Sequence, residues 1–327
     1  MLVNSGKRRR TVNGQKIMYK SVYFDISGVC NSKCPWCITG NRPLKSKRSS
    51  GFVKVGDFEK AIDRLIELRL VEPPAVINLF NWGEPLLHPE FGELLKILNR
   101  TKISFGISTN ASRCVSVESG LLTNMSCLTI SMPGFSQASY DKIHGFDFNK
   151  ILCNIDKLIE NFKKAGFQGS SILAYHIYQF NISEIKAAMD FCSDRKIVFS
   201  PYVAFLADFN LAKSYLDDSL SYETLKSISN DLLLYYIDDL IASAPGDYTC
   251  PEHENILAID EECNILTCCA VPKGHPDYSI GSIFNLSAGE IKKRKVSQNV
   301  CKECINSGLA YWLHNPLVPS FINNIQS

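Results

Sequence analysis

The chain has 327 residues, 45% of them hydrophobic, and its 35 basic and 33 acidic side chains leave a net charge of +2. This composition can bury a large core, and it excludes a disordered chain and a strongly basic nucleic-acid-binding tail. No apolar run reaches the roughly 20 residues of a membrane-spanning helix, and the basic N-terminus lacks the apolar segment of a signal peptide. We therefore expect a globular cytoplasmic protein with no membrane partner and no clear nucleic-acid partner.

Residues 1–20 are interpreted as a basic N-terminal tail, and a repeated βα rhythm follows them. Short β-branched runs alternate with longer amphipathic patterns in six units between Val22 and Ala204, which predicts parallel strands joined by helices. The fold class is therefore α/β, and residues 21–205 are predicted to form a partial (β/α)6 TIM-like barrel. The six predicted strands are VYFDIS, AVINLF, ISFGIS, LTISM, SILAYHI and IVFSPYVAF.

Three cysteines, Cys30, Cys34 and Cys37, lie close together in CNSKCPWC, directly after the first predicted strand. Thiolates at this spacing can hold three irons of a [4Fe–4S] cluster and leave the fourth iron without a protein ligand. A structural zinc site needs four ligands, and no fourth is local. A zinc knuckle that borrows a ligand from the cysteines beginning at Cys250 stays the alternative.

The segment NWGEPLLHPEF follows the second predicted strand, so it lies on the same face of the predicted barrel as the cysteine loop. Together the two motifs resemble the radical S-adenosylmethionine (SAM) superfamily, whose members carry a [4Fe–4S] cluster on a C-x3-C-x-aromatic-C loop. The resemblance implies SAM as a second cofactor and assigns the three cysteines to the cluster. It also assigns Trp36 to the adenine, and Gly83 with Glu84 to the methionine amino group. Trp82 replaces the first glycine of the family's Gly-Gly-Glu-Pro pattern.

Further SAM contacts follow from the same resemblance in LTISMPGFSQASYDKIHG. Ser131 matches a serine that contacts the ribose, whereas Pro133 replaces an acidic residue. His144 stands where the family has an arginine near the SAM carboxylate. Asn110, at the end of the third predicted strand, is either a polar SAM contact or a turn asparagine.

Residues 206–248 have a helical pattern and are predicted to connect the barrel to a small cysteine-rich domain at 249–327. This last segment resembles the auxiliary-cluster domain of the SPASM and twitch subclass. The resemblance implies a second [4Fe–4S] cluster on Cys250, Cys268, Cys301 and Cys304, with Cys263 in the place of a motif glycine. A zinc ribbon would satisfy the same four cysteines and stays open.

The resemblance implies an enzyme that reductively cleaves SAM to a 5′-deoxyadenosyl radical and abstracts hydrogen from a substrate carbon. We expect a two-electron oxidation of a small polar molecule, with an electron donor such as flavodoxin or ferredoxin. A peptide-modifying or epimerising enzyme with a thiol hydrogen donor is the alternative, and a zinc-binding interaction module is the alternative from another class. The catalytic candidates are Cys269, Cys263 and His176.

Four other cysteines, Cys114, Cys127, Cys153 and Cys192, are predicted to be buried and inert. Asp25 precedes the cysteine loop and is either structural or directed into the site. Basic residues that could attract an anionic substrate, or belong to a solvated surface, are Lys7 to Arg10, Lys45, Lys47 and Arg48.

Overall fold

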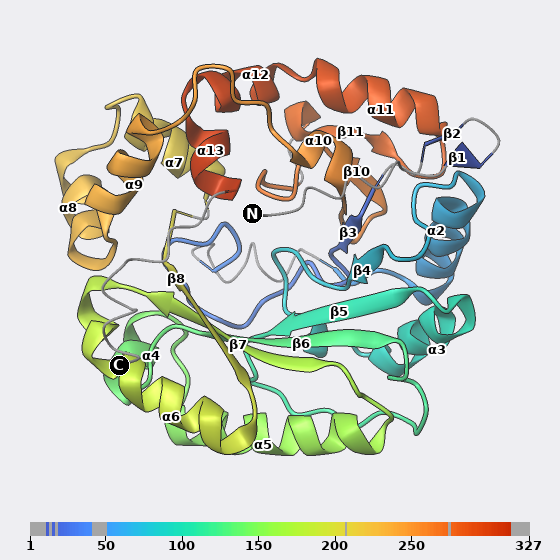
Figure 1. Ribbon diagram of the computed structural model, residues 1–327, viewed down its shortest axis with the longest axis horizontal. Coiled ribbons are helices and arrows are strands. Elements are labelled where there is room, and N and C mark those ends of the chain that lie inside the picture. The colour runs from blue at the N-terminus through green and yellow to red at the C-terminus, as the bar shows by residue number, and fades with distance from the viewer. Residues whose placement is uncertain are drawn as a thin grey trace, which may run out of the picture.

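The computed structural model describes residues 11–12, 15–16, 19–40, 51–206, 208–273 and 276–314. Within these ranges one nine-stranded sheet organises the chain, in the spatial order β11-β10-β9-β3-β4-β5-β6-β7-β8 (Figure 1). Strands β3 to β8 run parallel, β9 runs parallel to β3, and β10 and β11 are antiparallel. The strands are β3 (Ser21–Phe24), β4 (Val76–Asn78), β5 (Ser104–Thr109), β6 (Met125–Met132), β7 (Ser170–Ile177), β8 (Val198–Val203), β9 (Ile256–Ile259), β10 (Asn264–Leu266) and β11 (Ser279–Ser282).

Each of the six predicted strands overlaps one of β3 to β8, so the predicted partial (β/α)6 barrel is confirmed. The barrel does not close, because β3 pairs with β9 and not with β8. The cysteine-rich segment therefore continues the sheet at the edge where a closed barrel would join its last strand. Within the predicted tail, β1 (Thr11–Val12) and β2 (Gln15–Lys16) form a short antiparallel pair.

Helices cover the outer side of the sheet, and α3, α5 and α6 lie across the molecule from α11 to α13 (Figure 1). The α-helices are α2 (Val55–Glu67), α3 (Phe91–Thr101), α4 (Gln137–Lys142), α5 (Phe148–Lys164), α6 (Ile185–Arg195), α7 (Phe209–Leu216), α8 (Tyr222–Asp231), α9 (Leu234–Ala242), α10 (Glu252–Asn255), α11 (Ala288–Ser297), α12 (Asn299–Asn306) and α13 (Leu309–His314). The 3-10 helices are η1 (Pro85–Leu87), η2 (Gln179–Glu184) and η3 (Pro276–Tyr278). None of the helices in the described ranges is long and apolar enough to cross a membrane.

The helices form where apolar side chains recur at helical spacing. Helix α2 buries Phe58, Ala61, Ile62 and Leu65, which lie three or four residues apart and share one face. The predicted helical connector is interrupted: α8 ends at Asp231, and α9 begins three residues later. The intervening leucines are both buried, so this break lets two short helices each place an apolar face on the core.

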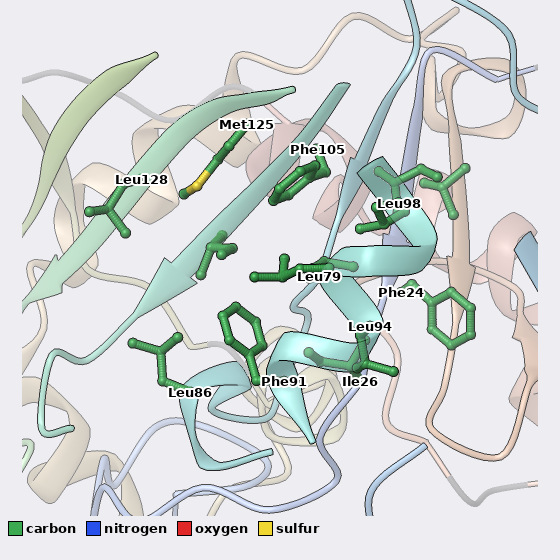
Figure 2. Packing of buried hydrophobic residues seen from close by; sticks show 14 of the residues in the cluster. Phe24, Ile26, Leu79, Leu86, Phe91, Leu94, Leu98, Phe105, Met125 and Leu128 are labelled. Carbon is green, nitrogen blue, oxygen red and sulfur yellow. The ribbon is translucent and has the colours of Figure 1, made fainter. Parts of the chain in front are cut away.

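The main core fills the space between the outer side of the sheet and its helices. Figure 2 shows Leu94 and Leu98 of α3 beside Leu79, which directly follows β4, and Phe105 of β5. All four side chains are fully buried. Because these apolar positions hold the outer side of each strand against a helix, the alternate positions are left to face the barrel interior.

Candidate functional site

The predicted site residues lie at the carboxyl ends of the barrel strands, where TIM-like barrels keep their active sites. The cysteine loop follows β3, the NWGEP loop follows β4, and Asn110 directly follows β5. Ser131 lies near the end of β6 and His176 near the end of β7. The structure thus brings segments that are far apart in the sequence to one end of the barrel.

In the cysteine loop, Cys30, Cys34 and Cys37 are all partly buried, and their thiols interact electrostatically with one another. The backbone N–H of Cys37 donates to the carbonyl of Cys34 at 3.3 Å, which closes a tight turn. Burial raises the pKa of Cys30 to about 11 and that of Cys34 well above its usual range. The thiols of Cys30 and Cys34 are therefore protonated at neutral pH, and metal binding would release their protons.

A buried carboxylate, that of Asp25, joins the end of β3 to the NWGEP loop. Its two oxygens accept the backbone N–H groups of Trp82 and Gly83, each at 3.1 Å. Burial raises the pKa of Asp25 to about 6, and the nearby charge of Lys273 opposes that rise. Lys273 Nζ lies 3.9 Å from Asp25 and 2.9 Å from both carboxylate oxygens of Glu261. Asp25 is thus structural, and it acts on the predicted SAM loop.

Gly83 is required by the close approach of two loops. A Cβ atom at this position would lie 1.6 Å from the backbone oxygen of Ser27, a contact that no side chain tolerates. The first glycine of the family pattern is replaced by Trp82, so in this chain Gly83 is the residue that permits the close approach.

The Glu84 side chain is held by three donors and is 3% exposed. One oxygen accepts Thr109 Oγ1 at 2.7 Å and the backbone N–H of Leu86 at 3.1 Å, and the other accepts the backbone N–H of Asn110 at 2.8 Å. Burial raises the pKa of Glu84 to about 7, against the effect of these donors. The second oxygen keeps a lone pair for a further donor.

Asn110 does more than end a turn. Its side-chain nitrogen donates to Ser32 Oγ at 2.8 Å and Asn31 Oδ1 at 3.0 Å, and lies 3.9 Å from Cys30 Sγ. Its side-chain oxygen accepts the backbone N–H of Ser112 at 2.9 Å. The end of β5 is therefore tied to the cysteine loop.

Polar side chains occupy the inner side of the last three barrel strands. Strand register places Ser131 of β6 beside Ala174 of β7, Ala174 beside Ser200 of β8, and His176 beside Tyr202. These residues alternate with large apolar ones of the core, including Leu173, Tyr175 and Ile177. A TIM barrel normally fills its interior with branched apolar side chains, so this polar interior is suited to a polar ligand.

Two histidines face this region. His176 Nε2 forms a short hydrogen bond with the Tyr202 hydroxyl, and burial lowers the pKa of His176 to about 4. Burial, reinforced by His176, lowers the pKa of His144 to about 3. Both imidazoles are therefore neutral at neutral pH. Among the described residues, His144 Nδ1 is buried without a hydrogen-bond partner, as are Asn81 Nδ2 and Trp82 Nε1, so polar atoms remain for a bound cofactor.

The second cysteine group lines one chamber, which we call the C-terminal chamber. Its walls include the four predicted ligands Cys250, Cys268, Cys301 and Cys304. Burial raises the pKa of Cys250 to about 12 and that of Cys301 to about 11. Contact with Cys269 lowers the pKa of Cys268 to about 7 and raises that of Cys269 itself.

The choice of metal depends on how the thiols are shared among metal ions. In the described ranges, no three His, Cys, Asp or Glu side chains converge closely enough to hold a single metal ion. Tetrahedral zinc draws four ligands to one centre, whereas each thiolate of a [4Fe–4S] cluster binds a different iron. Four thiols lining one chamber are a donor set that suits a [4Fe–4S] cluster and equally suits tetrahedral zinc.

The two catalytic cysteine candidates lie in different places. Cys263 is 1% exposed and belongs to the main core, with its thiol 3.9 Å from the backbone oxygen of Asp57. Its φ of 63° lies in the left-handed region, a conformation that suits the motif glycine whose place Cys263 takes. Cys269 interacts electrostatically with Tyr23, and Tyr23 also interacts electrostatically with Cys127 of β6. Cys269 is thus near the barrel interior, and Cys263 is not.

The structure also corrects the prediction for the scattered cysteines. Cys192 is buried as expected, but Cys153 is exposed, and Cys114 and Cys127 are only partly buried. Cys127 faces inward on β6, in register with Gly106 of β5. The basic residues Lys7 to Arg10, Lys45, Lys47 and Arg48 lie outside the described residues.

Sequence reasoning missed Lys273, Glu261, Tyr202 and Lys295. A signal existed for Lys295, because it follows the apolar Ile291 by four residues and so shares its helix face. The Asp25–Lys273–Glu261 contacts join residues about 240 positions apart, and no local pattern announces them.

Comparisons with known proteins agree with this geometry. A 7,8-dihydro-6-hydroxymethylpterin dimethyltransferase of Methanocaldococcus jannaschii is 26% identical over 192 residues, which are 54% of this chain and 35% of that protein. The chain thus spans about a third of the length of that curated relative.

Solved structures share the fold over most of the chain. SuiB of Streptococcus suis, bound to its precursor peptide SuiA, has a TM-score of 0.56 at 16% identity, over 90% of this chain and 71% of that one. The AdoMet-bound enzyme anSMEcpe has a TM-score of 0.53 at 16% identity, over 86% of this chain and 82% of that one. Residues 25–192, more than half of the chain, match the family model of the radical SAM superfamily, and the chain belongs to that superfamily.

Proposed function

We propose that this chain is a radical SAM oxidoreductase in which Cys30, Cys34 and Cys37 hold a [4Fe–4S] cluster. Membership of the family implies this cluster and SAM as cofactors. When bound, they supply a 5′-deoxyadenosyl radical that can take hydrogen from an unactivated carbon. The observation that carries the proposal is the convergence of three neighbouring thiols with the Gly83–Glu84 loop at one end of a polar barrel. A donor such as flavodoxin or ferredoxin would deliver the electron.

The chain's own residues would bind and orient SAM. Asp25 fixes the backbone beside Gly83, and the second oxygen of Glu84 has a lone pair for the methionine ammonium. Ser131 would meet the ribose and Trp36 the adenine. Asn110 would add a polar contact, and the neutral His144 would contribute a hydrogen bond in place of the positive charge of an arginine.

For residues 249–327 we propose an auxiliary-cluster domain, joined to the barrel of residues 21–205 by the connector 206–248. Cys250, Cys268, Cys301 and Cys304 would hold a second [4Fe–4S] cluster. Support comes from the chamber that the four thiols share, since thiolates are the ligands of iron–sulfur clusters.

The reaction we propose is a two-electron oxidation of a small polar molecule. The polar interior supports such a substrate, and the curated relative's name refers to a small pterin. Oxidation requires a proton acceptor and an electron acceptor. The neutral imidazole of His176, aligned by Tyr202, can take the proton. Tyr23 interacts electrostatically with Cys127 of β6 and with Cys268 of the C-terminal chamber.

A peptide substrate is the second candidate, because SuiB binds its precursor peptide SuiA and anSMEcpe has been solved with the Cp18Cys peptide. In an epimerising variant of this mechanism, Cys269 would return a hydrogen atom to the substrate. We place the enzyme in the cytoplasm, since none of the 13 cysteines, all within the described ranges, forms a disulfide.

Two clusters predict a definite iron content. The parent protein, reconstituted without oxygen, should bind about eight irons, and replacing Cys30, Cys34 and Cys37 by alanine should leave about four. Replacing Cys114, Cys153 and Cys192 is the matched control and should leave about eight, because these thiols are not proposed ligands. A parent protein with about four irons and one bound zinc would show that the C-terminal chamber holds zinc.

We call the two hydrogen bonds from Trp82 and Gly83 to the Asp25 carboxylate the Asp25 clamp. Because this clamp shapes the predicted SAM loop, Asp25→Asn should lower the affinity for SAM. The amide would turn its NH2 group toward one of the two backbone donors, so that donor would lose its acceptor. A hydrogen bond to a charged group contributes about 1.5–3 kcal/mol, so SAM should bind roughly ten times more weakly or worse. Calorimetry on the reconstituted protein measures this, with Asp239→Asn on the exposed side of α9 as the control. Unchanged affinity in Asp25→Asn would mean that the clamp does not position the SAM loop.

The oxidation proposal predicts the isotopic composition of the product. With the chain's substrate in deuterated water, the product should be lighter than the substrate by two hydrogens and carry no deuterium at the attacked carbon. Solvent deuterium at that carbon, lost in Cys269→Ala, would instead establish the thiol-donor alternative. Mass spectrometry distinguishes the two results.

A further inference from the structure

A lysine in α11, Lys295, is buried in the C-terminal chamber. Its side chain is 2% exposed, and it is among the largest fully buried side chains of the described residues. Lysine is almost never fully buried without a partner, because removing an ammonium from water costs several kcal/mol. The chain must therefore provide this cation with compensating groups.

Neutral groups hold the Lys295 ammonium in place. It donates to the backbone oxygens of Glu252, at 3.4 Å, and Ile256, and it lies 4.9 Å from the centre of the Tyr19 ring. Lys295 is not part of any salt bridge identified among the described residues. The Glu252 carboxylate also lines the chamber, with one oxygen 3.7 Å from His314 Nδ1. The ammonium is thus fixed in position by dipoles.

Two kinds of acidic group face Lys295, namely the Glu252 carboxylate and the cysteine thiols, which become thiolates when they bind iron. Lys295 lines the same chamber as the four proposed ligands and interacts electrostatically with Cys250, Cys268 and Cys301. The backbone oxygen of Lys295 also lies 3.8 Å from Cys301 Sγ. A cluster held by four thiolates is an anion, and it gains one further negative charge on reduction. A fixed cation beside it therefore stabilises the reduced form more than the oxidised form.

We propose that Lys295 is a positioning residue whose buried charge raises the reduction potential of the cluster in the C-terminal chamber. The inference rests on the proposed second cluster. A second contact acts in the same direction, since the backbone N–H of Ala270 donates to Cys268 Sγ at 3.5 Å. The higher potential makes this cluster a better acceptor of the single electron that leaves the substrate radical as its proton is lost.

The test measures a potential, not turnover. Lys295→Met removes the charge at nearly constant length and is prepared in the Cys30, Cys34 and Cys37 to alanine background, so that only the C-terminal cluster contributes. We expect the reduction equilibrium to weaken at least tenfold, a fall of about 59 mV in the midpoint potential of a one-electron couple. Anaerobic redox titration followed by electron paramagnetic resonance gives this value.

Two variants control for packing and for general charge. Lys292→Met lies on the exposed side of the same helix and should leave the potential unchanged. Lys295→Arg keeps the charge and should stay near the parent potential. If Lys295→Met fails to bind iron, Lys295→Gln replaces it with the same expected fall.

Different results would overturn the role of Lys295 and the existence of the second cluster. An equal potential in the parent and the neutral variant, with about four irons in each, would overturn the role of Lys295 and leave the second cluster standing. A shift in Lys295→Arg as large as in the neutral variant would also overturn it, because packing would then be the cause. Failure of the parent chamber to hold iron would instead remove the second cluster itself.

Discussion

The arrangement of the site depends on one buried carboxylate. Asp25 ends the first barrel strand and accepts two backbone N–H groups of the loop after the second strand. Glu261, between β9 and β10, and Lys273, between β10 and β11, complete a buried network around it. A lone carboxylate would be costly at this depth, so the C-terminal region must be in place for the SAM loop to keep its shape. The end of β3 is thereby linked to the C-terminal segment by these charged groups as well as by the pairing of β3 with β9.

A second constraint is that alternate residues of each barrel strand face opposite sides of the sheet. Alternate residues of β7, Leu173, Tyr175 and Ile177, pack against the helices, while His176 faces inward beside Tyr202. Apolar burial can therefore stabilise the barrel without filling its interior with hydrocarbon. The inward positions can therefore be polar, and the proposed oxidation uses one of them, His176, as the proton acceptor.

Much of the fold could be predicted because its signals are local. Alternating β-branched and helical patterns located all six parallel strands, and the spacing of Cys30, Cys34 and Cys37 indicated where metal chemistry would occur. The break between α8 and α9 escaped prediction, since the leucines there look helical and are placed by tertiary burial. Asp25 stayed ambiguous because its partners are distant in sequence, and Lys295 was overlooked because a lysine is expected at the surface.

The most direct test of the account is the formation of 5′-deoxyadenosine by the reconstituted protein under strong reductant with SAM present. The account predicts that the parent forms it together with methionine in equal amounts, and that Cys34→Ala forms neither. Chromatography quantifies both products. A parent protein that binds iron at the β3 loop but leaves SAM intact, or a Cys34→Ala variant as active as the parent, would contradict the central claim.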